Sequence, residues 1–127
     1  MNNQKSVYIV IGISLFVGLL HFLIGPEYNG IFKSFVTGYL IDILLPMNLY
    51  LLLQISLRKM IATTKSRIIG AIFTFLLGST IEILQFYEIK FLGSIFDIID
   101  IFMYALGVLL GLFIDFTIID RLEEKKQ

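Results

Sequence analysis

The sequence has 127 residues but contains no cysteine and no tryptophan, and it has only one histidine. The absence of cysteine excludes disulfides, thiolate metal sites and cysteine nucleophiles. Because His21 is the only histidine, we do not expect haem or zinc sites built from histidine clusters. The sequence therefore predicts neither a metal nor a cofactor.

Charged residues are also scarce. They make up 16% of the chain, whereas soluble domains have about 25%. Hydrophobic residues make up 57%, and the mean hydropathy is +0.90. The formal net charge is zero, so nothing favours nucleic acid as a partner. This composition predicts an integral membrane protein whose main partner is the lipid bilayer.

Four apolar segments are long enough to cross about 30 Å of hydrocarbon at about 1.5 Å per residue. They cover residues 7–24, 36–57, 67–86 and 98–119 and are joined by short connections. The first segment is longer than a signal-peptide core, and no A-x-A-like site follows it, so we expect a retained helix. The sequence therefore predicts an all-α membrane protein with one domain, residues 1–127, in which four transmembrane helices form a compact bundle.

The basic residues predict the orientation of this bundle. With four spans, eight of them lie on one side: Lys5, Arg58, Lys59, Lys65, Arg67, Arg121, Lys125 and Lys126. Only Lys33 and Lys90 lie on the other side. The positive-inside rule then predicts an N-in/C-in topology, with both termini and the middle connection in the cytoplasm. We expect the C-terminal stretch RLEEKKQ, residues 121–127, to be solvated.

This topology assigns a depth to each polar residue in the spans. Ionisable or strongly polar residues are concentrated in the outer half of the bundle: His21, Asp42, Glu82, Gln85, Asp97 and Asp100. Asp42, for example, lies about 9 Å below the outer boundary at the helical rise per residue. Asp97 is also a candidate N-cap for the last span. The one-sided depth predicts an outward-facing polar site.

The same residues share helix faces with small residues. In the last span, steps of three or four residues join Asp97, Asp100, Tyr104, Gly107, Gly111 and Asp115. The other stripes are Thr74, Gly78, Glu82 and Gln85; Ser14, Gly18, His21 and Gly25; and Gly38, Asp42 and Pro46. Small residues allow helices to approach closely, and polar side chains in lipid must face protein or water. We therefore expect the stripes to converge on the bundle interior.

The outer site is rich in acid, and unpaired carboxylates are costly in lipid. Three arrangements are compatible with the sequence. The carboxyls are partly protonated and share hydrogen bonds, or they hold Ca²⁺ or Mg²⁺, or they line a water-filled vestibule. Pro46 adds a related choice, because it removes the hydrogen bond to the carbonyl oxygen of Asp42. It predicts either a packing kink or an additional oxygen ligand.

Two stretches, STIEILQF and FDIIDIFMYALGVLLG, resemble the VanZ-like family of small bacterial membrane proteins. Glu82 and Gln85 match the Glu-x-x-Gln element of that family, and Asp100 matches its aspartate. Gly107 and Gly111 match its glycines, and Tyr104 stands where many members carry Asn. GYLIDILLPMNLYLLL resembles the earlier helix in which Asp42 is the matching acid. The chain departs from many family members in having no arginine in the loop before the last span, where it reads LGSIFD, and no histidine in the region after Asp42.

The resemblance implies a multi-pass protein of the bacterial cytoplasmic membrane with a link to resistance to the glycopeptide teicoplanin. Together with the stripes, it predicts a binding site made of His21, Asp42, Glu82, Gln85, Asp100 and Tyr104. Our main hypothesis is an envelope-associated binding or accessory protein for a lipid headgroup, an envelope precursor or a lipophilic glycopeptide antibiotic. The alternatives are a small transporter or cation-coupled subunit, and an intramembrane enzyme that uses paired carboxylates.

An enzyme is the less favoured alternative, because no nucleophile or metal motif accompanies the carboxylates. A purely structural role also stays open. In that role Glu82, Gln85 and Asp100 would only join the third and fourth spans by interhelical hydrogen bonds.

Overall fold

The computed structural model of the chain describes residues 4–24, 28–87 and 96–124, and all regular secondary structure in them is helical. The elements are α1 (Gln4–Leu23), α2 (Lys33–Gly38), α3 (Leu40–Met60), α4 (Thr63–Phe86), α5 (Ile98–Ile114), the π-helical turn η1 (Asp115–Ile119) and α6 (Asp120–Glu124). The last three run on as one helix of 27 residues. With α1, α3 and α4 it gives four helices that are long and apolar enough to cross a membrane. The predicted all-α architecture of four spanning helices is confirmed.

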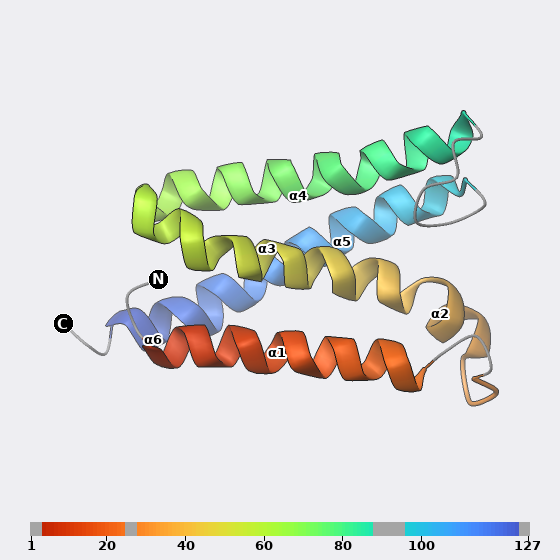
Figure 1. Cartoon of the computed structure of the whole chain (residues 1–127), viewed down its shortest axis with the longest axis horizontal. Coiled ribbons are helices and arrows are strands. Elements are labelled where there is room, and N and C mark those ends of the chain that lie inside the picture. The colour runs from red at the N-terminus through yellow and green to blue at the C-terminus, as the bar shows by residue number, and fades with distance from the viewer. Residues whose placement is uncertain (1–3, 25–27, 88–95, 125–127) are drawn as a thin grey trace.

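The four long helices pack around α3, which contacts α1, α4 and α5. In Figure 1, α3 lies between α1 and α4, and α5 crosses behind it. Gln4, the turn between α3 and α4, and Glu124 lie at one end of the bundle, which we call the termini end. The short α2 and the start of α5 lie at the opposite end, which we call the loop end. Which end faces the cytoplasm stays a prediction.

The second span starts later than the sequence predicts. Residues 36–38 belong to the short α2, and α3 begins at Leu40 and continues to Met60. The backbone enters α2 through Phe32, which has a left-handed φ of 59°. The break falls at Gly38 and Tyr39, within three residues of the predicted start of the span.

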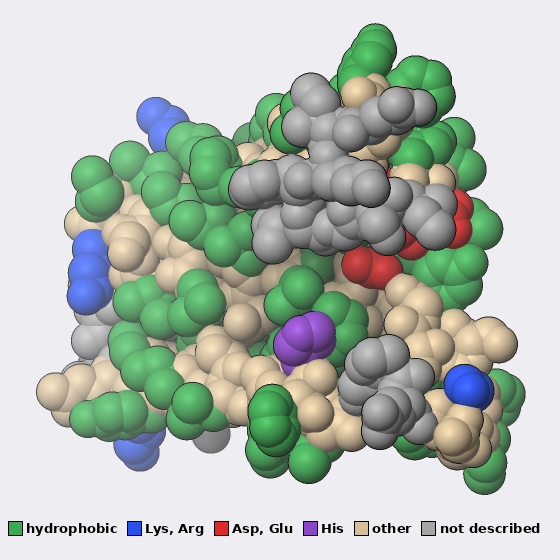
Figure 2. Space-filling model, turned by 45° about the vertical axis from the view of Figure 1, so that its right-hand side comes forward, with side chains coloured by type: hydrophobic (Ala, Val, Ile, Leu, Met, Phe, Trp, Pro, Cys, Tyr) green, Lys and Arg blue, Asp and Glu red, His purple; other side chains and the backbone are tan. Residues whose placement is uncertain are grey.

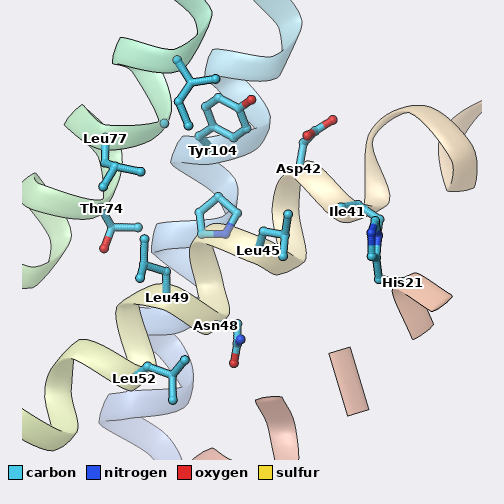
Figure 3. A pocket seen from close by; sticks show the side chains of 13 residues that line it. His21, Ile41, Asp42, Leu45, Asn48, Leu49, Leu52, Thr74, Leu77 and Tyr104 are labelled. Carbon is cyan, nitrogen blue, oxygen red and sulfur yellow. The ribbon is translucent and has the colours of Figure 1, made fainter. Parts of the chain in front are cut away.

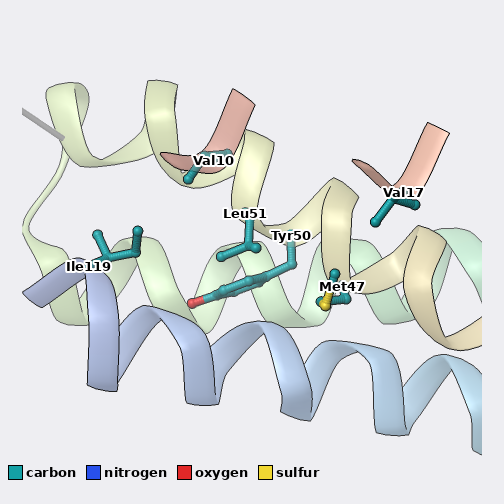
Figure 4. Packing of buried hydrophobic residues seen from close by; sticks show 6 residues of the cluster. All are labelled: Val10, Val17, Met47, Tyr50, Leu51 and Ile119. Carbon is teal, nitrogen blue, oxygen red and sulfur yellow. The ribbon is translucent and has the colours of Figure 1, made fainter. Parts of the chain in front are cut away.

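Only a small set of apolar side chains is buried inside the bundle (Figure 4). The core cluster consists of Val10, Val17, Met47, Tyr50, Leu51 and Ile119. Most other large apolar side chains point outward along the full length of the helices, as Leu15 and Phe102 do. A surface of this kind suits hydrocarbon rather than water, so the outward face supports a bilayer environment.

Glycines bring α5 against α3 and α4. A Cβ atom at Gly107 would collide with the carbonyl oxygen of Ile43, and one at Gly111 would lie 2.8 Å from the ring of Tyr50. The stripe on α5 therefore does face the bundle interior, as predicted. The prediction is wrong for Gly18 and Gly38, which have no such neighbour within 4 Å. α1 packs mainly through Val10 and Val17, so its glycine face is left uncovered. Gly25 lies outside the described residues.

Candidate functional site

The loop end is organised by the first turn of α5. The Asp97 carboxylate accepts a hydrogen bond of 2.9 Å from the backbone N–H of Ile99, so Asp97 is the predicted N-cap. The backbone N–H of Asp97 itself donates to Glu82 Oε2 at 3.3 Å. Glu82 therefore joins the end of α4 to the start of α5.

A second hydrogen bond fixes the same carboxylate. The Tyr104 hydroxyl donates to Glu82 Oε1 at 2.8 Å. The Tyr104 ring can reach this position because Gly78 leaves it room, and a Cβ at Gly78 would lie 2.8 Å from Tyr104 Cδ2. Glu82 is only 1% exposed. The pair Glu82 and Tyr104 is thus a buried interhelical hydrogen bond made possible by a glycine one turn away.

Four carboxylates gather here, and we call Asp42, Glu82, Asp97 and Asp100 the acidic cluster. They are close enough to interact electrostatically with one another. Glu82 and Asp97 have hydrogen-bond donors, as above, but the side chains of Asp42 and Asp100 have neither a donor nor an ion pair within the described part of the chain. The described residues also contain no group of three His, Asp or Glu side chains arranged to hold a metal ion.

A groove of about 610 Å³ opens beside this cluster. Its volume lies within the ~300–1,000 Å³ typical of ligand sites. Its floor is one stripe of α3, Asp42, Leu45, Leu49 and Leu52, at steps of three and four residues. His21 of α1 lines one side, Thr74 and Leu77 of α4 line the other, and Tyr104 lies behind (Figure 3).

The groove is polar at its mouth and apolar along its length. Asp42 and His21 lie toward the loop end, and the three floor leucines lead away from them (Figure 3). In the space-filling view, the histidine lies in a hollow of this face, with acidic side chains toward the loop end (Figure 2). From Asp42 to Leu52 the helical rise gives about 15 Å, which is half of a ~30 Å hydrocarbon core. The groove is therefore about one leaflet deep.

The predicted site residues fall into two groups. Asp42, His21 and Tyr104 line the groove. Glu82 and Asp100 belong to the acidic cluster beside it, but do not line it, and nor does the half-buried Gln85.

Sequence reasoning did not assign Asn48 and Thr74 to the site, although both line the groove. Asn48 Oδ1 accepts a hydrogen bond of 2.6 Å from Ser14, which ties α1 to α3. The Thr74 hydroxyl is buried and has no partner among the described residues. The predicted site comprised residues of the outer half only, and the length of the groove brings Asn48 and Thr74 to the same site.

Pro46 packs against the α5 glycine stripe. It is buried inside α3, its ring lines the groove, and its Cβ would lie 3.2 Å from a Cβ placed on Gly107. These contacts favour the packing interpretation of Pro46.

A second polar cluster lies at the termini end, and the sequence did not predict it. We call Arg58, Arg67, Asp115, Asp120 and Glu123 the ion-pair cluster. Arg58 pairs with Asp115 at 2.5 Å, with Asp120 at 3.2 Å and with Glu123 at 3.3 Å. Arg67 pairs with Asp115 at 3.1 Å and also with Asp120. The cluster joins α3, α4 and the last helix of the bundle.

The centre of this cluster is fully enclosed. Asp115 is 0% exposed and the Arg58 side chain 2%. Tyr50 adds a hydrogen bond of 2.8 Å from its hydroxyl to Asp115. The prediction of a solvated tail is wrong for Glu123, whose carboxylate is held by Arg58. Glu123 reaches Arg58 because α6 continues the last helix past the two arginines.

Gln54 and Ser66, next to the ion-pair cluster, bond to each other. Gln54 donates to the Ser66 carbonyl oxygen at 3.1 Å, and the Ser66 hydroxyl donates to Gln54 Oε1 at 2.9 Å. Both side chains are fully buried. Tyr50 and Leu51, also fully buried, lie on α3 between Asn48 of the groove and Gln54. Among the described residues, no hydrogen bond joins the polar groups of the two ends.

No protein-family model, curated protein or solved structure matches this chain. The resemblance to the VanZ-like family stays a prediction based on the residues quoted for it.

Proposed function

We propose that this chain is an envelope-associated membrane protein that binds one amphiphilic molecule in the groove between α1, α3 and α4. The observation that carries the proposal is the shape of the groove. It is polar at the loop end, apolar along three leucines of α3, and about one leaflet deep. An occupant with a polar head and an apolar chain matches both parts.

The position of the groove supports an occupant that comes from the bilayer. Its floor residue Leu45 is 48% exposed on a bundle whose surface is mostly apolar. A lipid chain can therefore enter from the side without crossing water. The polar end lies at the level of Asp42, in the first turn of α3, where a headgroup would lie at the membrane boundary.

Three ligand classes fit this description: a lipid headgroup with its chain, a lipid-linked envelope precursor, and a lipophilic glycopeptide antibiotic such as teicoplanin. Membership of the VanZ-like family belongs to the same proposal. It is supported by the proximity of Glu82 and Asp100, two of the residues on which the resemblance rests.

Binding is favoured over transport by the termini half of the bundle. A transporter needs a polar path beyond the groove, but Gln54, Ser66 and Asp115 are paired with one another or with neighbours. Tyr50 and Leu51 fill the interior between them and the groove. Catalysis by paired carboxylates is supported by no further group beside Glu82 and Asp100.

The test is to fill the groove and measure what the protein retains. We would purify the protein from membranes in a neutral detergent and measure bound amphiphiles by native mass spectrometry. Leu45→Trp places a large ring on the groove floor. Leu109→Trp is the matched control, because Leu109 is a lipid-facing leucine of α5 with 60% exposure and is not part of the groove.

We expect the unchanged protein and Leu109→Trp to retain an amphiphile and Leu45→Trp to lose it. Equal retention by both variants would place bound lipid elsewhere on the surface and contradict the proposal. Circular dichroism and size-exclusion profiles would show that both variants are folded, so that a loss reports on the groove.

A further inference from the structure

The mouth of the groove carries charge of one sign. Asp42 lines it, and the other three carboxylates of the acidic cluster are near enough to act on Asp42 electrostatically. Lys33 is the one described lysine or arginine at the loop end. It is exposed, donates to Asn29 at 2.6 Å, and forms no ion pair with a described residue. The described part of the chain therefore supplies no cation to the acidic cluster.

Two of the four carboxylates lack donors. Glu82 accepts from Tyr104 and from a backbone N–H, and Asp97 caps α5. Asp42 and Asp100 are half-buried and have no such partners among the described residues. Carboxylates at membrane depth normally pair with one another, with a cation or with water. Among the described residues nothing pairs with Asp42 and Asp100, and the groove beside Asp42 leaves room for a cationic group of a bound molecule.

The other polar groups of the groove suit a different part of the same occupant. His21 lies on the α1 side of the groove, near Ile41 (Figure 3). Its imidazole offers an N–H donor, which an anionic or ester oxygen accepts. The amide of Asn48 lies farther in. Its oxygen accepts a hydrogen bond from Ser14, and its N–H₂ group can donate one to an occupant. The groove thus offers acceptors at its mouth and donors beside and below them.

We propose that the occupant is a membrane lipid with a free primary amine, an aminophospholipid, whose ammonium group pairs with Asp42 in the groove and is attracted by the neighbouring charge of Asp100. A primary ammonium has three N–H donors, which suit a half-buried carboxylate with a second carboxylate beside it. Its phosphate or ester oxygens would accept from His21, and its acyl chain would lie along Leu45, Leu49 and Leu52. This inference rests on the proposed function and narrows it to one headgroup chemistry.

The test compares headgroups on one chain. We would titrate the full-length protein in neutral micelles with lysophosphatidylethanolamine, lysophosphatidylcholine and lysophosphatidylglycerol that carry the same acyl chain, and measure each Kd by native mass spectrometry. We expect the ethanolamine lipid to bind about tenfold more tightly than the glycerol lipid. The choline lipid has a cation without N–H donors and should fall between them.

Two substitutions make the test specific. Asp42→Asn should raise the Kd of the ethanolamine lipid about tenfold and leave the Kd of the glycerol lipid unchanged or lower. Glu124→Gln removes the same charge from an exposed residue at the termini end and should change neither. Asp100→Asn serves as the second variant if Asp42→Asn does not fold, and the same selective loss is expected from it.

The outcomes separate this inference from the proposed function. Equal Kd values for the three headgroups, or no effect of either Asp variant, would overturn the amine inference while groove binding stands. Failure of all three lipids to bind would overturn the amine inference, and the proposed function would fall with it only if Leu45→Trp also retained as much amphiphile as the unchanged protein. If the Asp variants lose binding of the ethanolamine lipid only, while Glu124→Gln does not, the result supports both the amine inference and the proposed function.

Discussion

The two ends of the bundle differ in how their charged side chains are paired. At the termini end, two arginines and three acids lie within ion-pair distance, and the central Asp115 is completely buried. At the loop end, four carboxylates lie together without a described cation, and a groove opens beside them. The same helices α3, α4 and α5 run from one cluster to the other.

This difference separates a structural polar cluster from a candidate binding site. In the ion-pair cluster, each charge is matched by a residue of another helix, so its contribution is to hold those helices together. In the acidic cluster, Asp42 and Asp100 have no such match among the described residues, and Asp42 faces a cavity. Ionisable groups inside a membrane that the protein itself does not pair are functional-site candidates.

The sharpest test of the comparison asks whether the two ends lie on opposite sides of the membrane. The chain has no cysteine, so single cysteines can be introduced without background. Lys33→Cys and Lys65→Cys replace exposed lysines at the loop end and the termini end. In intact cells, a membrane-impermeable maleimide should label the first variant fully, and the second only after permeabilisation. The reverse pattern would place the groove mouth in the cytoplasm and exclude an outer-leaflet ligand.

The next largest effect is expected from breaking the ion-pair cluster. Asp115→Ala leaves Arg58 and Arg67 with fewer acids and Tyr50 without its acceptor. Removing one partner of a buried ion pair costs about 3–5 kcal/mol. We expect the free energy of unfolding in mixed micelles with sodium dodecyl sulfate to fall by that amount. A loss under about 0.5 kcal/mol, the range of surface substitutions, would show that these charges are solvated and not structural.

A smaller effect is expected where α3 and α5 approach between the two clusters. Gly107→Ala places a methyl group against the carbonyl oxygen of Ile43, and overpacking of this kind costs about 1–3 kcal/mol. Gly18→Ala is the matched control, because nothing lies within 4 Å of its Cβ position. Alanine is a better helix former than glycine by up to about 1 kcal/mol. The control should therefore leave the unfolding free energy unchanged or raise it, and a similar loss in both variants would count against the close contact.

Much of the loop end could be predicted from the sequence, because its parts are close along the chain or on regular helix faces. Gly78, Glu82 and the stripe of α5 keep a spacing of three or four residues, so the pairing of Glu82 with Tyr104 follows from two helices joined by a short connection. The cap at Asp97 needs only local information. The groove could not be predicted, since it depends on how far α1 stands from α4.

The ion-pair cluster could not be predicted from the sequence for two physical reasons. Arg58 and Asp115 are 57 residues apart, and the arginines were counted only as orientation signals. In addition, a regular α-helix turns about 100° per residue, which would point Asp120 about 140° away from Asp115. The π-helical turn Asp115–Ile119 changes this register, with the backbone N–H of Asp120 bonded to the carbonyl oxygen of Asp115. Both acids can then reach the same two arginines.

The smallest expected effect concerns the one paired carboxylate of the acidic cluster that joins two helices. Tyr104→Phe removes the hydroxyl that donates to Glu82 and leaves that carboxylate with the Asp97 backbone N–H. Interhelical hydrogen bonds in membranes contribute about 0.6–2 kcal/mol, so we expect a loss of about 1 kcal/mol in the same unfolding assay. Because the ring remains against Gly78, groove binding should survive. If Tyr104→Phe abolished amphiphile binding without loss of stability, the hydroxyl would be serving the ligand rather than Glu82. Tyr104 would then belong to the binding site rather than to the structural contact between α4 and α5.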